Sequence, residues 1–207
     1  TGVNMRENSA TPHYVGLDIG TSQVRCVIGT RDANDPAAIS VIGHGVSANQ
    51  GMRRGVIMHV DDTVEAIVQA MTEAERIAGV RIDAATVNVN GAHVTGMNSR
   101  GTIAISSPNR EITPDDRDRV EEAAAIVKLP ANREILQVFA KNYRLDGQDN
   151  LKDPVGMHGV RLEVDCHILT AATPNVRNLD LALEKAQVRP QHHTVSSLAA
   201  AEAILDR

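Results

Sequence analysis

The residues with the clearest chemical potential form one short segment, Gly16-Leu17-Asp18-Ile19-Gly20-Thr21-Ser22-Gln23. A tight turn between two strands, built from glycine and small hydroxyl residues, directs backbone N–H groups into one concavity, and such a nest binds phosphate oxygens. Asp18, at the end of the first strand, would face this pocket and hold Mg²⁺ through water, because Mg²⁺ sheds its hydration reluctantly. Thr21 and Ser22 add hydroxyl groups. The competing interpretation is a plain hairpin turn, since Asp-x-Gly-Thr is a short pattern that occurs widely by chance.

The histidines and serines near the C-terminus favour structural roles. His192 and His193 are adjacent, so in a strand they point to opposite faces and cannot chelate one ion. One of Ser196 and Ser197 is expected to cap the helix that follows. No Ser/His/Asp or Cys/His arrangement has supporting context, so the sequence does not predict nucleophilic hydrolase chemistry.

Composition narrows the classes of function. The chain has 207 residues, 42% of them apolar and 23% charged, with a net charge of −5. It has two tyrosines, one phenylalanine and no basic run longer than Arg53-Arg54, so it lacks the stacking platforms and positive surface that bind nucleic acid. No segment approaches the roughly 20 apolar residues of a membrane span, and the N-terminus lacks the apolar core of a signal peptide. We therefore expect a soluble, cytoplasmic protein in which Cys26 and Cys166 are reduced core thiols.

The turn must be positioned by alternating strands and helices. The pattern predicts a β-hairpin over 14–29, then a strand, then a helix between an Asp61 N-cap and the glycine Gly79. From Ala84 onward, short strands surround one helix announced by Thr113-Pro114, which predicts a separate strand-helix-strand-strand layer. Residues 1–12 are polar and aperiodic, so we expect a disordered tail. The other expected strands are 39–46, 86–89, 101–106, 134–145, 159–170 and 192–195, and the other expected helices are 113–128, one from Thr173, and 198–205.

Four motifs resemble, in order, those of the FtsA family of bacterial cell-division proteins. They are Tyr14-Val15-Gly16-Leu17-Asp18-Ile19-Gly20-Thr21-Ser22, Gly51-Met52-Arg53-Arg54-Gly55-Val56-Ile57, Asn98-Ser99-Arg100-Gly101, and Asp153-Pro154-Val155-Gly156-Met157 through Arg161-Leu162-Glu163. The first also resembles the opening of actins, sugar kinases and heat-shock chaperones, where this turn is the first phosphate loop; a Walker loop instead leads into a helix and carries Gly-Lys-Ser/Thr. The later motifs are more specific, and the resemblance covers nearly everything from 14 to 205.

The resemblance implies an α/β fold with an inserted subdomain. An actin-like (ribonuclease-H-like) subdomain, 1A, would span residues 13–83 and 171–207, the last part including the start of an interdomain helix. A strand-helix-strand-strand (SHS2-type) subdomain, 1C, would be inserted at 84–170. In the family, 1C serves self-association into actin-like filaments and contacts with later division proteins. Full-length members link FtsZ to the inner face of the cell membrane at the division site.

The resemblance also implies half of an ATP site. Gly20, Thr21, Ser22 and Gln23 would contact the nucleotide phosphates, and Asp18 would hold Mg²⁺ through water. Many relatives have Lys where this chain has Gln23, and a neutral amide donates to phosphate without bringing a charge, so about tenfold weaker nucleotide binding is expected. His59 replaces an Asp or Asn of many relatives, so no metal or nucleotide role is assigned to it.

The last expected helix, 198–205, is rich in alanine and needs a packing partner, so we expect a longer protein. By resemblance, the second phosphate loop, the adenosine pocket, the FtsZ-binding subdomain and a membrane-binding amphipathic helix would follow Arg207. Because actin-like sites clamp nucleotide between two halves, this chain alone is expected to hold no ATP or Mg²⁺ and to lack ATPase activity. Two alternatives remain: a sugar or acetate kinase with the same phosphate hairpin, and a PilM-type pilus-assembly adaptor, which shares the insert.

Overall fold

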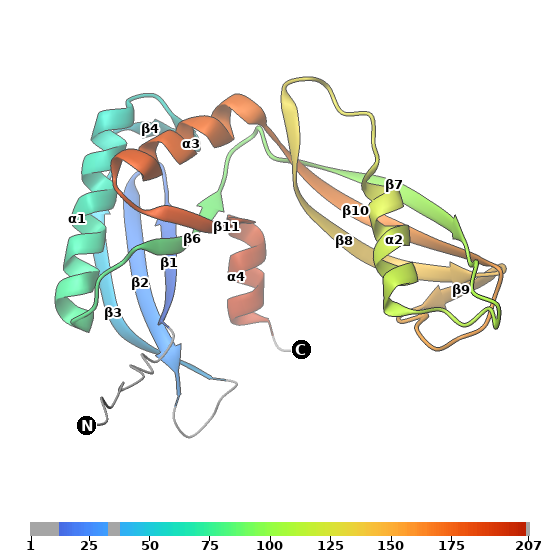
Figure 1. Ribbon diagram of the computed structural model, residues 1–207. Helices are drawn as coiled ribbons and strands as arrows, with labels where there is room; N and C mark the ends of the chain where they lie inside the picture. The colour runs from blue at the N-terminus through green and yellow to red at the C-terminus, as the bar shows by residue number, and fades with distance from the viewer. Residues whose placement is uncertain (1–12, 33–37, 206–207) are drawn as a thin grey trace, which may run out of the picture. The chain divides into compact units, whose positions relative to one another are not determined.

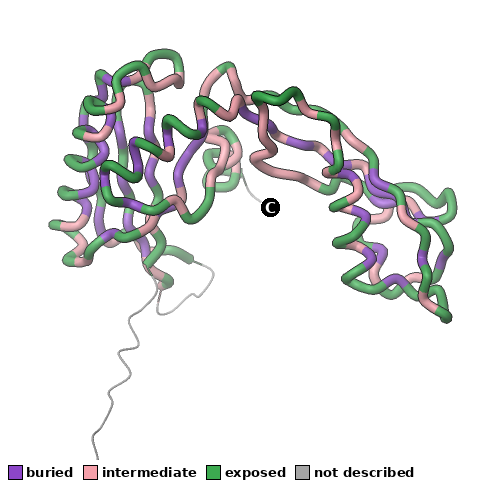
Figure 2. The backbone as a smooth tube through the Cα atoms, turned by 45° about the horizontal axis from the view of Figure 1, so that its top comes forward, coloured by how far each residue is buried: buried purple, intermediate pink, exposed green. Residues whose placement is uncertain are grey.

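The computed structural model describes residues 13–32 and 38–205, which form two compact units (Figure 1). The first unit combines the residues up to Gly91 with those from Arg177 onward, and the second is Ala92–Val176. Buried residues line the strands of both units (Figure 2), so each unit has its own core. The predicted tail, residues 1–12, lies outside the described residues. No helix in the described ranges is long and apolar enough to cross a membrane.

The first unit is built on a five-stranded sheet. Its strands are β1 (His13–Ile19), β2 (Gln23–Arg31), β3 (Ile39–Ala48), β6 (Ala84–Val89) and β11 (Arg189–Val195), in the order β11-β6-β1-β2-β3. β11, β6 and β1 run parallel, whereas β1, β2 and β3 form an antiparallel meander that confirms the predicted hairpin. Alternation places Leu17 and Ile19 of β1 and Val24, Cys26 and Ile28 of β2 on one face, where each is at most 2% exposed.

Helix α1 (Val60–Ala78) packs on β2 and β3. Glycine permits the close approach, because a Cβ at Gly45 of β3 would lie 2.0 Å from the carbonyl oxygen of Ala70. The short hairpin β4 (Met52–Arg53) and β5 (Val56–Ile57) precedes α1. Helix α3 (Thr173–Lys185) buries Leu179 and Leu183, whereas α4 (Ser196–Ile204) has no buried residue in the described chain.

The two ends of α1 test the predicted helix signals differently. Gly79 ends the helix with a φ of 70°, which confirms the predicted C-terminal glycine. The predicted N-cap, Asp61, is wrong, because the helix begins at Val60 with His59 as its N-cap and no side-chain cap bond. The carbonyl of Gly51 accepts the N–H groups of both Met58 and His59, which turns the chain into the helix two residues earlier.

The second unit is a four-stranded antiparallel sheet with one helix. The strands are β7 (Thr95–Ala104), β8 (Arg133–Leu145), β9 (Gln148–Leu151) and β10 (Arg161–Ala172), in the order β7-β10-β8-β9. Helix α2 (Pro114–Ala125) lies directly on β7, since a Cβ at Gly101 would be 2.2 Å from the carbonyl oxygen of Val120. Beneath the helix lies a core made of Ile105, Ile112, Val120, Ala124, Tyr143, Leu145, Leu162, Val164, Cys166 and Ile168.

The start of α2 confirms the predicted threonine cap. The hydroxyl of Thr113 accepts the N–H of Asp116, and the carboxylate of Asp116 accepts the N–H of Thr113, so two orphan donors are satisfied reciprocally. Pro114 occupies the first turn, where its missing N–H costs nothing. The helix ends at Ala125, a few residues before the predicted end.

The second unit begins later in the sequence than the expected insert, 84–170. Strand β6 lies in the first sheet, where Gly16 of β1 is the neighbour of Thr86. Ala85, Val87 and Val89 are at most 3% exposed and face the core of the first unit. A short apolar strand fits either sheet by its pattern, and only the pairing with β1 and β11 decides between them.

The neck of the second unit is the place where the chain enters it, near Thr95, and leaves it, near Thr170. One arginine links these two segments. Thr95, which begins β7, and Thr170, near the end of β10, are cross-strand partners whose hydroxyl oxygens lie 3.2 Å apart. Arg133, which begins β8, donates to the carbonyl of Thr170 at 3.0 Å, to the carbonyl of His93 at 3.0 Å and to both threonine hydroxyls. The segments that enter and leave the unit are therefore fastened side by side.

Candidate functional site

The phosphate-type turn joins β1 to β2 and consists of Gly20, Thr21 and Ser22. The N–H of Gly20 donates to the carbonyl of Gln23 at 3.0 Å, and a Cβ at Gly20 would lie 2.9 Å from that oxygen. A side chain at this position would therefore crowd the turn. Thr21, Ser22 and Gln23 are exposed. Among the described residues nothing accepts a hydrogen bond from the N–H groups of Thr21 and Ser22, so both stay available to an anion.

Asn49, which follows β3, holds the turn through hydrogen bonds to its carbonyl groups. This residue is 5% exposed. Its N–H donates to the carbonyl of Ser22 at 2.9 Å, its side-chain nitrogen donates to the carbonyl of Gly20 at 2.8 Å, and its side-chain oxygen accepts the N–H of Gly51 at 2.9 Å. The amide thus fixes the carbonyls of the turn on the side away from solvent.

The β4–β5 turn packs against the same site. The hydroxyl oxygen of Thr21 accepts the N–H of Gly55 at 3.0 Å. Gly55 has a φ of 77°, and a Cβ there would lie 2.7 Å from the Cα of Gly91 in the loop after β6. Only glycine fits both the conformation and the space. The glycines of the segment 51–57 therefore hold three loops together at one edge of the sheet.

Asp18 is held by a buried amide. The side-chain nitrogen of Asn88, on β6, donates to the Asp18 carboxylate at 2.7 Å and to the hydroxyl of Ser196 at 3.0 Å, and its oxygen accepts the N–H of Ile19 at 2.6 Å. Asn88 is 6% exposed. It connects β1, β6 and the start of α4. Ser196 serves here as a partner of Asn88, and the predicted serine N-cap is wrong, because the N-cap of α4 is Val195.

Arg25 places a positive charge beside the turn. It lies opposite Asp18 in the β1–β2 register, and its guanidinium is 3.4 Å from the Asp18 carboxylate and donates to the side-chain oxygen of Gln23 at 2.9 Å. Both partners of the ion pair are about half exposed, so the pair adds little to stability. Its relevance is to binding, because it brings a cation to within reach of the exposed turn.

The site lies at the carboxyl edge of the parallel strands. β1, β6 and β11 run in the same direction, so the turn after β1, the loop after β6 and the start of α4 meet at that edge. Ligands of open α/β sheets bind at this edge.

No cluster of three or more His, Cys, Asp and Glu side chains suited to a metal ion occurs in the described residues. His193 pairs with Asp180 at 2.9 Å.

The sequence predicted Asp18, the turn residues Gly20, Thr21 and Ser22, and Gln23 at the start of β2 as site residues, and they lie together because they are contiguous. It missed Asn49, Asn88 and Arg25. Arg25 could have been found, since alternation puts it on the same face as Gln23 and hairpin pairing puts it opposite Asp18. Asn88 is 70 residues from Asp18 in the chain, and no local pattern reports that contact.

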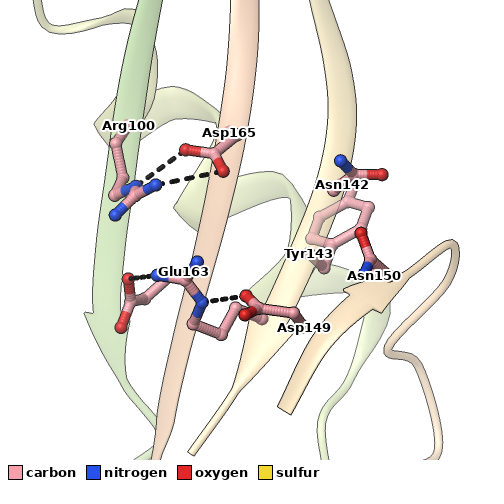
Figure 3. A pocket seen from close by; sticks show the side chains of 8 residues that line it. Arg100, Asn142, Tyr143, Asp149, Asn150, Glu163 and Asp165 are labelled. Carbon is pink, nitrogen blue, oxygen red and sulfur yellow. Dashed lines mark hydrogen bonds and ion pairs between the residues drawn. The ribbon is translucent and has the colours of Figure 1, made fainter. Parts of the chain in front are cut away.

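A polar cavity of about 220 Å³ lies on the sheet of the second unit (Figure 3). Arg100 donates to both carboxylate oxygens of Asp165, at 2.7 and 3.1 Å, and Arg144 pairs with Asp149 and with Glu163. Arg100 holds the pKa of Asp165 below its usual range, chiefly through this hydrogen bond. Each charged group is paired with a group of opposite charge, so we assign the cavity a structural role. Its lining consists of Arg100, Asn142, Tyr143, Arg144, Asp149, Asn150, Glu163 and Asp165.

Comparisons with known proteins agree with this architecture. Residues 91–170 match the family model described as the SHS2 domain inserted in FTSA. The chain is 36% identical over 191 residues to the cell division protein FtsA of Pseudomonas aeruginosa, covering 92% of this chain and 45% of that protein. It is also 36% identical over 194 residues to FtsA of Bacillus subtilis, covering 94% of this chain and 43% of the relative.

The chain is a homologue of FtsA. It spans about half the length of the curated relatives it matches. A chain of the solved PilM-PilN type IV pilus biogenesis complex superposes on this chain with a TM-score of 0.60 at 14% identity. The match covers 93% of this chain and 50% of the other. That likeness concerns the fold. Together these matches confirm the predicted actin-like fold with an SHS2-type insert, in an FtsA-like cell-division protein.

Proposed function

We propose that this FtsA homologue is a cell-division scaffold whose first unit supplies half of an ATP site and whose second unit binds other proteins. The observation that carries the nucleotide half is the turn after β1. It presents the free N–H groups of Thr21 and Ser22 beside the carboxylate of Asp18 and the guanidinium of Arg25. Backbone donors and a cation suit phosphate, and a carboxylate suits hydrated Mg²⁺.

Each residue of the half-site has a distinct task in this proposal. The turn from Gly20 to Gln23 donates to the phosphates. Asp18 holds Mg²⁺ through water, and Asn88 keeps its carboxylate in place. Arg25 supplies the positive charge that Gln23 lacks, and its hydrogen bond to the Gln23 side chain holds both groups over the same face of the hairpin. When bound, Mg-ATP would supply the charge that ties this half of the protein to the opposite half.

The partners are assigned from the family. We propose that the first unit is subdomain 1A and the second is subdomain 1C, which self-associates in actin-like filaments and contacts later divisome proteins. The link to FtsZ and to the inner face of the cell membrane would belong to segments beyond this chain. The proposal is supported by 36% identity to FtsA proteins and by the SHS2 match over 91–170.

Calorimetry tests the half-site. The chain as given should show no micromolar binding of Mg-ATP, whereas the longer protein should bind it. In the longer protein, Arg25→Gln should weaken ATP binding about tenfold, and Gln23→Lys should strengthen it about tenfold, because a charge-assisted hydrogen bond replaces or is replaced by a neutral one. If both variants bound Mg-ATP with the same affinity as the parent protein, the turn would not be part of the nucleotide site.

Two assays separate the alternatives. An FtsA-type scaffold should co-purify, as the longer protein, with an FtsZ peptide and leave a pilus-protein peptide unbound, and a PilM-type adaptor should show the reverse. A sugar or acetate kinase would transfer the γ-phosphoryl group to a metabolite in a substrate screen. Transfer at enzymatic rates would overturn the scaffold proposal.

A further inference from the structure

We propose that the outer edge of β7 is an interface through which two copies of this chain pair, β7 against β7 in antiparallel orientation, joining their four-stranded sheets into one. The inference deepens the proposed self-association of the second unit and rests on it. It adds a closed, symmetric contact between two copies, separate from the head-to-tail contacts that extend an actin-like filament, and it assigns this contact to ten named residues, Thr95–Ala104.

The first observation is that this edge is open. β7 is the terminal strand of its sheet and pairs only with β10, from Thr95 opposite Thr170 to Ala104 opposite Arg161. In the described chain no backbone group of another segment bonds to residues 95–104. A strand edge of this kind carries a row of unpaired N–H and C=O groups, which is a template for another strand.

The second observation is that the other sheet edges are defended and this one is not. At the edge of β3, the N–H of Val46 donates to the carboxylate of Glu73. At the edge of β11, Pro190 is followed by a register shift. In the sheet of β7 itself, the opposite edge strand β9 has only four residues, and its neighbour β8 has two register shifts against β10. These are devices that keep edges from pairing. β7 has an unbroken register with β10 and contains no proline, aspartate, glutamate or lysine.

The one charged side chain of β7 does not prevent another strand from pairing with its edge. Its one charged residue is Arg100, and that guanidinium is held by both carboxylate oxygens of Asp165 on the neighbouring strand β10. An edge arginine that is paired with the neighbouring strand leaves the outer row of backbone groups accessible.

A second copy fits because one symmetric register avoids like charges. In antiparallel pairing centred on Asn98, Arg100 of each copy lies opposite the uncharged Gly96 of the other. The two arginines are then four residues apart along the strands, or about 14 Å. Gly101, on which α2 sits, lies opposite Thr95 of the other copy. The two helix contacts are then six residues apart, about 20 Å, so the helices do not collide.

Site-specific cross-linking tests this register. Asn98→Cys places two thiols directly opposite each other, within the reach of a disulfide. Thr102→Cys is the matched control, because the same face of the same strand carries it, but in this register the two thiols are eight residues apart, about 27 Å. The native Cys26 and Cys166 are buried. Mild oxidation should give a covalent dimer for Asn98→Cys and not for Thr102→Cys. Equal cross-linking, or none at concentrations where the chain self-associates, overturns the proposal.

Sedimentation of the chain without cross-linking gives the second readout. The parent chain should dimerise with concentration, and Asn98→Lys should raise the dimer dissociation constant by about tenfold or more, because two like charges face each other. Gln148→Lys, on the exposed edge strand β9, should leave it unchanged. Dimerisation that is insensitive to Asn98→Lys overturns the β7 interface and leaves self-association standing. A chain that stays monomeric overturns the pairing of copies and reassigns the edge to a segment of another protein.

Discussion

Asn88 connects more of the candidate site than any residue in the conspicuous turn. Its four hydrogen bonds reach Asp18, the N–H and the carbonyl of Ile19, and Ser196, and its side chain is almost wholly buried. A buried amide with all its groups satisfied specifies one arrangement of its neighbours, because each broken bond would leave a polar group without water. The orientation of the Asp18 carboxylate is thus set from β6 and not from the turn itself.

Replacement of Asn88 by leucine tests this role at the level of one residue. Asn88→Leu has a similar volume, but it leaves the buried N–H of Ile19 without a partner, which should cost about 1–3 kcal/mol of the free energy of unfolding. Urea denaturation measures the loss. Asn178→Leu, on the exposed surface of α3, is the control and should change stability by less than about 0.5 kcal/mol. Equal effects of the two substitutions would show that the amide network is not what stabilises this edge.

The helix α2 depends on the reciprocal cap between Thr113 and Asp116. The N–H and hydroxyl of Thr113 donate to the Asp116 carboxylate, which lowers the pKa of Asp116 below its usual range, and Arg119 contributes less. The side chain of Asp116 is 8% exposed. Since these bonds favour the ionised form, the cap is fully present above the pKa of the unfolded chain and is lost as the pH falls through the lowered pKa of the folded state.

The cap predicts a pH dependence at the level of this helix. From pH 6 to about pH 4 the contribution of Asp116 to the free energy of unfolding should be constant, and below about pH 4 it should decline. Asp116→Asn cannot titrate, so the difference in unfolding free energy between parent and variant should shrink as the pH is lowered from 5 to 3. Chemical denaturation at each pH measures this difference. A gap that widens toward acid would contradict the assigned sign.

At the scale of helices and strands, the sequence predicted those features that depend on residues close together in the chain. The threonine cap of α2, the Gly79 terminus of α1 and the first hairpin were all predictable, because each depends on residues within a few positions. The sheet to which β6 belongs was not predictable, because its neighbours β1 and β11 are remote in sequence. In the same way the motif was enough to predict the turn of the candidate site, but it did not indicate the contacts of Asn49 and Asn88.

At the scale of the whole molecule, the described residues form two compact units, and each has buried apolar side chains of its own. The core of the first is centred on α1 and its sheet, where Ile67 is fully buried, and the core of the second lies under α2, where Leu162 is fully buried. Each core buries its own apolar surface, and stability can therefore differ between the two units.

Paired core substitutions test this independence. Leu162→Ala and Ile67→Ala should each cost about 2–5 kcal/mol in the unit that contains them. Native-state hydrogen exchange should show faster exchange in β7, β8 and β10 for the first variant, and in β1, β2 and β6 for the second. Each variant is the control for the other. Equal acceleration throughout the chain in both variants would mean that the units open as one cooperative body.

The neck of the second unit has a consequence for how such a protein arises. Because Thr95 and Thr170 are cross-strand partners and Arg133 fastens the segments around them, the ends of the second unit lie next to each other. A module whose ends are adjacent can be spliced into a single loop of a host fold without stretching it. Evolution can therefore exchange or remodel the second unit by editing one junction, while the proposed phosphate-binding edge of the host sheet is inherited unchanged.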